Sequence, residues 1–161
     1  MTDPIRPTDD ESRALARQLM QDARYAAMGV IQENGLPLVT RTGFGLSPAG
    51  APLCLVSSLS AHTRALQANP ACSLLVGEPG RKGDPLNHPR LSLTGTMSFI
   101  RQGEPGHAAM AAAYLRGHPK AKLYIGFADF AFACLAVEAA FLNGGFGKAF
   151  QLTARDLGIS S

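Results

Sequence analysis

The chain has 161 residues, 46% of them hydrophobic, which is enough for a buried core and excludes a chain that is disordered along its whole length. Its formal net charge is +3, and the basic residues are spread out without an arginine-rich arm, which argues against a nucleic-acid-binding protein. No apolar run approaches the roughly 20 residues that a membrane helix needs, and the polar N-terminus lacks the apolar segment of a signal peptide.

The first element predicted is a helix that follows a loose tail. Residues 1–8 form the tail, and the helix is expected over 9–24. Its start is marked by a capping box that pairs Thr8 with Glu11. Apolar residues then recur at helical spacing as far as Met20, so one side of the helix is expected to face a core.

Short apolar runs separated by turn residues dominate the rest of the chain. They predict strands over residues 25–31, 36–42, 53–57, 71–77, 91–100, 130–137, 139–142 and 146–152. Asn34-Gly35 is a strong signal for a hairpin turn between the first two strands. Because turn-length links join most of these strands, the sheet is predicted to be antiparallel.

Two longer connections interrupt the strands. The Gly/Pro-rich segment 77–90 is long for a loop in a compact domain, which indicates a functional or mobile loop. Residues 104–126 are predicted to be a helical insertion, with an Ala-rich helix that Gly117-His118-Pro119 ends and a shorter helix after it. A last short helix is expected after Thr153. The whole chain, 1–161, is therefore predicted to be one mainly-β domain, a barrel decorated by helices and not a βαβ series.

The segment that links the strand at 53–57 to the following helix carries hydroxyl, imidazole and guanidinium groups close together. These donors belong to Ser57, Ser58, Ser60, His62, Thr63 and Arg64. Backbone N–H groups at a helix N-terminus are unpaired and attract anions, so this turn is a candidate site for a phosphate. The alternative is that Ser60 only caps a short surface helix, and the residues leave both interpretations open.

Two further cations stand beside small residues. Arg41 lies near the end of a predicted strand, next to Thr42, where a guanidinium can clamp a phosphate through two hydrogen bonds. Lys148 follows Asn143-Gly144-Gly145, whose glycines let backbone approach a flat ligand. The alternatives are a solvent-facing arginine and a tight hairpin, and the residues do not decide between them.

Catalytic and metal-binding motifs are not found. The histidines have no HxxxH or HxH spacing and the three cysteines form no CxxC pair, so no metal site is predicted. No G-x-S-x-G nucleophile motif occurs, and no catalytic residue is assigned. An odd number of thiols in apolar runs favours a reducing compartment, so we expect a cytoplasmic protein with neither membrane nor nucleic acid as partner.

Together these segments resemble the pyridoxamine 5′-phosphate oxidase-like FMN-binding split-barrel superfamily. The likeness runs from the first predicted strand to the Gly-rich hairpin. Its strongest part is Ser60-Ala61-His62-Thr63, then a short helix ending in Asn69-Pro70, then a strand beginning Cys72-Ser73. Within the superfamily the HugZ-type haem-utilisation branch is the most similar. The phrases that carry this second likeness are Leu-Val-Ser-Ser-Leu-Ser-Ala-His-Thr, Gly-Asp-Pro-Leu-Asn-His-Pro-Arg-Leu and Gly-Gly-Phe-Gly-Lys-Ala.

The resemblance implies a six-stranded antiparallel split β-barrel that binds FMN. In the superfamily, residues at the positions of Ser60 and His62 hold the FMN phosphate, and an arginine stands at the position of Arg41. Arg90 precedes a strand that touches the flavin across a dimer, so a homodimer with the cofactor at its interface is expected. The cofactor-binding residues predicted from the motifs and the resemblance are Arg41, Thr42, Ser57, Ser58, Ser60, His62, Thr63, Arg90 and Lys148.

The function implied is that of an FMN-dependent oxidoreductase acting on a small or planar substrate. Pyridoxamine-phosphate oxidase itself is not expected, because the C-terminal segment has no Trp. The alternatives are a HugZ-like protein that binds or degrades haem, and a non-catalytic protein that holds flavin or haem. Full-length members of that branch continue past the position of Ser161 with a region that contributes to haem binding, and this departure bears on the haem-degrading alternative.

Overall fold

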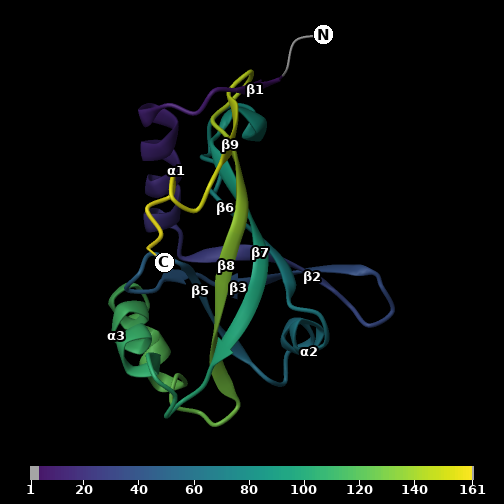
Figure 1. The fold of residues 1–161 in the computed structure, drawn as a ribbon, viewed down its shortest axis with the longest axis vertical. Helices are drawn as coiled ribbons and strands as arrows, with labels where there is room; N and C mark the ends of the chain where they lie inside the picture. Colours follow the sequence, from purple (N-terminus) through teal and green to yellow (C-terminus); the bar gives the residue numbers. More distant parts are fainter. Residues whose placement is uncertain (1–3, 161) are drawn as a thin grey trace.

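The computed structural model describes residues 4–160, which form one sheet with helices around it (Figure 1). The helices are α1 (Asp10–Asp22), α2 (Ala61–Ala68) and α3 (His107–Gly117), with the 3-10 turns η1 (Pro85–Asn87) and η2 (Pro119–Leu123). The strands are β1 (Ile5–Arg6), β2 (Tyr25–Ile31), β3 (Pro37–Gly43), β4 (Gly45–Leu46), β5 (Pro52–Ser57), β6 (Ala71–Val76), β7 (Arg90–Ile100), β8 (Phe130–Asn143) and β9 (Ala149–Leu152).

The sheet is an open and mostly antiparallel barrel. Its strands follow the order β1-β9-β8-β7-β6-β2-β3, while β5 pairs with both β8 and β4. Within residues 4–160 no ladder joins β3 to β5, so the barrel is split along this line, and the β1–β9 pair is the parallel one. The predicted count of six strands is not confirmed, because the described chain has nine. Six of these have six or more residues, and β1, β4 and β9 have two to four.

The N-terminal segment differs from its prediction in two details. α1 is capped by Asp9 and not by Thr8: the Asp9 carboxylate accepts the Ser12 N–H at 2.7 Å, and the Ser12 hydroxyl accepts the Asp9 N–H at 3.0 Å. Thr8 instead donates its hydroxyl to the Gln151 carbonyl. The expected loose tail contains β1, which pairs with β9, and residues 1–3 lie outside the described part of the chain.

β7 and β8 form a long ribbon that runs most of the height of the molecule (Figure 1). The strands predicted over 130–137 and 139–142 are one strand, because Glu138 is the extra residue of a β-bulge where a break was expected. Gly95 faces this bulge on β7, and a Cβ here would collide with the Ala136 carbonyl oxygen. Before the bulge β8 pairs with β5, and after it β8 pairs with β9.

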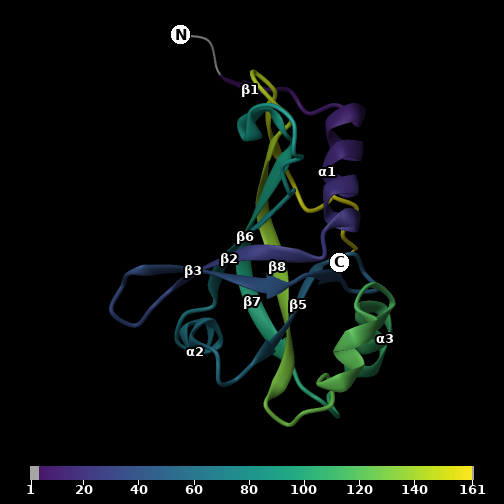
Figure 2. The same cartoon turned by 180° about the vertical axis from the view of Figure 1, so that it is seen from behind.

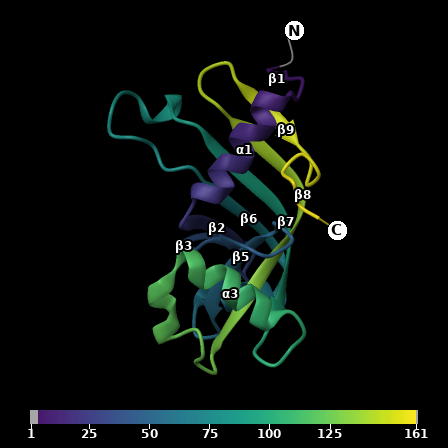
Figure 3. The ribbon, with the colours of Figure 1, turned by 90° about the vertical axis from the view of Figure 1, so that its left-hand side faces the viewer.

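The helical insertion lies on the opposite side of the barrel from α2 (Figure 1, Figure 3). Its helix α3 begins at His107 and not at 104, and the expected second α-helix is the 3-10 turn η2. After Thr153 the chain makes hydrogen-bonded turns where a helix was predicted. No helix within residues 4–160 is long and apolar enough to cross a membrane.

The inner side of the sheet carries the main core. Side chains at alternate positions of β2, β6 and β7 point inward, and Met28, Leu74 and Leu93 are at most 1% exposed. α1 packs on this core through Ala16 and Met20 (Figure 2). A smaller second core forms where α3 meets β5 and β8, with the buried members Leu53, Leu55, Tyr114, Ala121 and Phe132.

Candidate functional site

The outer side of the sheet is crossed by a row of cross-strand neighbours. From β3 to β8 the row consists of Arg41, Ala27, Leu75, Ser92 and Phe141. Strand alternation puts this row on the side opposite to Met28 and Leu74, which lie in the core. We call the side that carries the row the outer face.

The outer face is apolar and exposed. Val39 is 68% exposed, Leu75 and Phe141 are each 44% exposed, and Tyr25 is 40% exposed, although all four belong to paired strands. Single exposed apolar residues are common on proteins, but a contiguous apolar patch marks a site for a ligand or another chain. Arg41 adds one cation to this patch.

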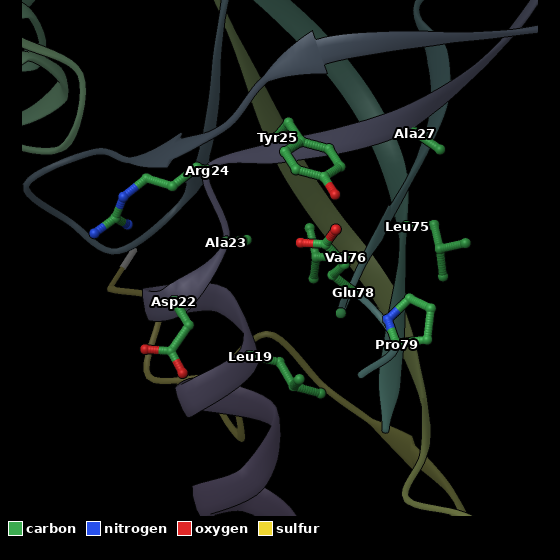
Figure 4. A pocket seen from close by; sticks show the side chains of 11 residues that line it. Leu19, Asp22, Ala23, Arg24, Tyr25, Ala27, Leu75, Val76, Glu78 and Pro79 are labelled. Carbon is green, nitrogen blue, oxygen red and sulfur yellow. The ribbon is translucent and has the colours of Figure 1, made fainter. Parts of the chain in front are cut away.

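The outer face deepens into a hollow of about 510 Å³ where α1 ends beside β2 and β6 (Figure 4). Its apolar lining comes from Leu19, Ala23, Ala27, Leu75, Val76 and Pro79. The Tyr25 hydroxyl and the Glu78 carboxylate point toward each other inside it, whereas the Arg24 side chain is directed away from them. An apolar lining of this size with a few converging polar groups is typical of a small-molecule site.

Tyr25 and Glu78 line this hollow, and Arg41, which lies outside its lining, joins them in a polar cluster through its contact with Tyr25. The guanidinium carbon of Arg41 stands 5.3 Å from the centre of the Tyr25 ring, in cation–π contact. A hydrogen bond from the Tyr25 hydroxyl to the Glu78 carboxylate raises the pKa of Tyr25 above its ordinary value of 10.0, and desolvation raises it further. Tyr25 is therefore protonated at neutral pH, and Arg41 supplies the positive charge of the cluster.

The second group of candidate residues surrounds the start of α2. The His62 ring is half-buried, and its Nδ1 lies 2.9 Å from the Thr40 hydroxyl on β3. Burial lowers the pKa of His62, so its imidazole is neutral near pH 7. Thr40 and the buried Thr42 point to the inner side of β3, whereas Arg41 points outward. The predicted phosphate ligands Arg41 and His62 therefore lie on opposite sides of one strand.

The hydroxyl side chains just before and at the start of α2 also differ from one another in exposure and in hydrogen-bond partners. The Ser57 hydroxyl donates to the Asp129 carboxylate at 2.6 Å, close to the start of β8. Thr63 is 2% exposed, whereas Ser58 is exposed. Ser60 occupies the N-cap position of α2, but its side chain makes no capping hydrogen bond, so the simple cap considered as an alternative is not formed.

Arg90 and Lys148 lie at the far end of the β7–β8 ribbon. Arg90 pairs with Asn143 there, and Lys148 is exposed on the loop that leads into β9. The Arg90 guanidinium donates to the carbonyls of Leu86 and His88 at 3.0 and 3.3 Å. In Figure 1 this end is at the top and α2 is in the lower part, so one copy of the chain does not bring these two cations to the α2 turn.

Sequence reasoning missed Tyr25 and Glu78. Tyr25 was available from the strand pattern, because alternation along the predicted strand 25–31 sends Tyr25 and Ala26 to opposite sides. Glu78 belongs to the Gly/Pro-rich segment 77–90, where no local pattern joins it to the first strand. The contact between the two residues depends on the pairing of β2 with β6.

Metal-ligating side chains do not gather anywhere in residues 4–160: no three of its His, Cys, Asp or Glu side chains are arranged to hold an ion. The cysteines are free thiols, and burial raises the pKa of Cys72 to about 12. Such a thiol carries almost no thiolate at neutral pH and is therefore a poor ligand or nucleophile.

The known proteins similar to this chain include some whose names mention haem and one whose name mentions pyridoxinephosphate oxidase. The family described as CREG, beta-barrel matches residues 7–157. The chloroplastic heme oxygenase HOZ of Arabidopsis thaliana is 34% identical over 117 residues, which cover 73% of this chain and 35% of HOZ. A solved heme-binding protein from Mycobacterium smegmatis is 28% identical, with a TM-score of 0.82, over 96% of this chain and 61% of that one.

A third similar structure extends the likeness in fold. It is a Clostridium acetobutylicum protein of the pyridoxinephosphate oxidase family, 16% identical, with a TM-score of 0.70. The alignment covers 93% of this chain and 99% of that one, and at this identity it shows a shared fold. By contrast, the chain spans about a third of HOZ and less than two thirds of the mycobacterial protein.

Proposed function

Because the chain belongs to the CREG β-barrel family, in the split-barrel superfamily near the HugZ branch, we propose that it binds haem on the outer face of its sheet. The observation that carries this proposal is the apolar hollow lined by Tyr25, whose ring contacts the Arg41 guanidinium. Two of the similar proteins, 34% and 28% identical, are named for haem.

The chemistry of the hollow matches that of the ligand. A porphyrin is a flat apolar ring with carboxylates at its rim; Ala27 and Leu75 offer apolar contact, and Arg41 offers a partner for a carboxylate. The Tyr25 ring contacts the guanidinium, and the Tyr25 hydroxyl faces the Glu78 carboxylate. Each charge-assisted hydrogen bond contributes about 1.5–3 kcal/mol, and apolar burial adds about 25 cal/mol per Å². Bound haem would supply the redox chemistry.

A second copy of the chain is part of this proposal. A flat ring in an open hollow keeps one side in water, and a symmetric partner would cover that side. The exposed Val39, Leu75 and Phe141 supply apolar surface for such a contact. The contribution expected of Arg90 to a neighbouring site depends on this homodimer, because within one chain Arg90 lies far from α2.

The second candidate function is that of an FMN-dependent oxidoreductase acting on a small or planar substrate. Ser58 and Ser60 favour it, because they stand at the N-terminus of α2 and their hydroxyls make no hydrogen bond within residues 4–160. A helix N-terminus with free donors stabilises a phosphate. The separation of Arg41 from His62 across β3 weighs against it, since the phosphate would lose one of its two predicted cations.

Titration with haemin, followed through the haem absorbance band, tests the first proposal. The matched variants are Arg41→Gln and Arg64→Gln, because Arg64 is an exposed arginine on α2 that is not part of the outer face. We expect wild type and Arg64→Gln to bind alike. Arg41→Gln should bind at least tenfold more weakly, since it loses one charge-assisted partner of a carboxylate. Equal binding by all three proteins would remove the outer face as the site.

A parallel titration with FMN, read from quenching of flavin fluorescence, separates the two candidates. Saturable FMN binding without a haem band would replace haem by flavin as the cofactor. Reduction of that bound flavin by NADH or NADPH, with reoxidation in air, would then identify an oxidoreductase. A bound flavin that is never reduced would identify a carrier.

A further inference from the structure

A second hollow lies between α2, the end of β7 and the start of β8. It encloses about 450 Å³, and the lining residues that matter here are Val56, Thr63, Phe99, Arg101, Asp129 and Phe130. It shares no lining residue with the hollow on the outer face. A ligand of this hollow is therefore separate from the haem proposed above, whereas it would share Ser58 with the phosphate site of the FMN alternative.

Arg101 and Asp129 line this hollow without pairing with each other. The guanidinium carbon of Arg101 stands 5.6 Å from the centre of the Phe99 ring, and the group makes no ion pair or hydrogen bond within residues 4–160. The Asp129 carboxylate accepts the Ser57 hydroxyl at Oδ2, and its Oδ1 has no partner among the described residues. A cation and an anion that line one space without neutralising each other suit a ligand that carries both charges.

The rest of the lining is mostly apolar, and an unpaired hydroxyl is buried behind its surface. Val56, Phe99 and Phe130 are apolar, and the buried Oγ1 of Thr63 makes no hydrogen bond in the described chain. Buried hydroxyls nearly always have a partner, so this one marks a place where a donor or acceptor is missing. The Gln102 amide donates to two carbonyls of the loop before β8, which fixes one wall of the hollow.

We propose that this hollow binds a free α-amino acid with an apolar side chain. Arg101 pairs with the carboxylate, Asp129 accepts from the ammonium group, and the side chain packs against Val56 and Phe130. A simple anion would meet the Asp129 carboxylate, and a simple cation would meet the Arg101 guanidinium. Each of these ligands would gain one ion pair and suffer one repulsion, whereas a dipolar ion satisfies both groups.

Calorimetric titration with L-leucine tests the proposal, using two analogues that each lack one charge. 4-Methylpentanoate has no ammonium group, and 3-methylbutylamine has no carboxylate. The variants are Arg101→Gln and Asp129→Asn, of which the second keeps an oxygen for the Ser57 hydroxyl. Arg81→Gln is the control, because Arg81 is an exposed arginine on the segment 77–90.

We expect L-leucine to bind at millimolar concentration or below, and each analogue to bind at least tenfold more weakly. Arg101→Gln and Asp129→Asn should each weaken L-leucine at least tenfold, while Arg81→Gln and the haem titration of all variants stay unchanged. No binding of L-leucine, equal affinity for either analogue, or unchanged affinity in both variants would overturn the proposal. The first of these results would mean that Arg101 and Asp129 are only solvated surface groups or close on each other.

Discussion

Leu74 and Leu75 are neighbours on β6, and they show how differently the two sides of one sheet are built. Leu74 is 1% exposed and pairs with Met28, whereas Leu75 is 44% exposed and pairs with Ala27. The same alternation that fills the core therefore leaves an apolar surface that the described chain does not bury. Such a surface is accounted for by a ligand or a second chain, not by the stability of the single chain.

The polar groups of the two sides differ in the same way. On the inner side of β3 the Thr40 hydroxyl meets His62, so both polar groups are satisfied within the chain. On the outer face the Arg41 guanidinium contacts the ring of Tyr25 and forms no ion pair within residues 4–160. Polar residues of the inner side thus belong to the fold, and those of the outer face are available to a ligand.

The largest effect is expected from Leu74→Ala, which should lower the free energy of unfolding by about 2–5 kcal/mol. The loss comes from the apolar transfer energy and from the cavity left in the core. Leu75→Ala, its matched control, should cost less than about 1 kcal/mol, because a surface substitution leaves no cavity. Equilibrium urea unfolding of both variants measures the difference, and similar losses would break the distinction between the two sides.

The next effect concerns association. Leu75→Glu should weaken self-association at least tenfold, because a buried interface would have to desolvate an unpaired carboxylate. Leu123→Glu on η2 is the control, since Leu123 is 79% exposed and does not belong to the outer face. Sedimentation equilibrium measures both. A dimer that persists in Leu75→Glu, or dissociates only in Leu123→Glu, would assign the interface elsewhere.

A smaller effect sharpens the description of the outer face. Glu78→Gln should lower the pKa of Tyr25 toward its ordinary value of 10.0, because the carboxylate that accepts the Tyr25 hydroxyl is replaced by a neutral amide. Ultraviolet difference titration of phenolate formation measures it. Tyr114 and Tyr124 are present in wild type and in Glu78→Gln, so their contributions cancel when the two titration curves are subtracted. An unchanged titration curve would mean that Tyr25 and Glu78 do not interact in solution.

The smallest effect concerns the inner side and its pH dependence. Burial lowers the pKa of His62 below its ordinary value of 6.5, so below pH 6.5 the unfolded chain binds a proton that the folded chain does not. Stability should therefore fall as the pH drops through this window, until His62 is protonated in both states. In His62→Gln the fall should be shallower, as measured by urea unfolding between pH 7 and pH 5. If the free energy of unfolding of His62→Gln changed with pH as steeply as that of wild type, His62 would be excluded as the source of the pH dependence.

Much of the fold could be predicted from local patterns. β2 begins and ends at the predicted residues 25 and 31, because alternation and the Asn34-Gly35 turn define that hairpin. The resemblance to the split-barrel superfamily is also confirmed. The cap of α1 was wrong by one residue, since Thr8 and Asp9 both precede suitable partners and only the contact with Ser12 decides. Two strands were predicted on either side of Glu138, and the bulge that makes them one strand depends on pairing with β7.

The candidate site could be predicted only in part. The sequence predicted Arg41 and His62 as ligands of one phosphate, but closeness along the chain does not say on which side of β3 each one lies. Tyr25 and Glu78 come together through the pairing of β2 with β6, a long-range contact that no local motif encodes. Whether Arg90 and Lys148 join any site depends on a second copy, which lies beyond single-chain reasoning.

The bulge at Glu138 has one more consequence. It changes which positions of β8 face the core: the buried Leu135 precedes the bulge at an odd position, and the buried Ala140 and Leu142 follow it at even positions. Deletion of Glu138 would leave Val137 opposite Gly95 and Ala139 opposite Thr94, so we expect the strand to lose its bulge while Ala140 and Leu142 stay buried. A residue removed between Ala140 and Asn143 would instead exchange the two sides of the strand and disturb its pairing with β9, so this part of β8 tolerates a lost residue only at the bulge.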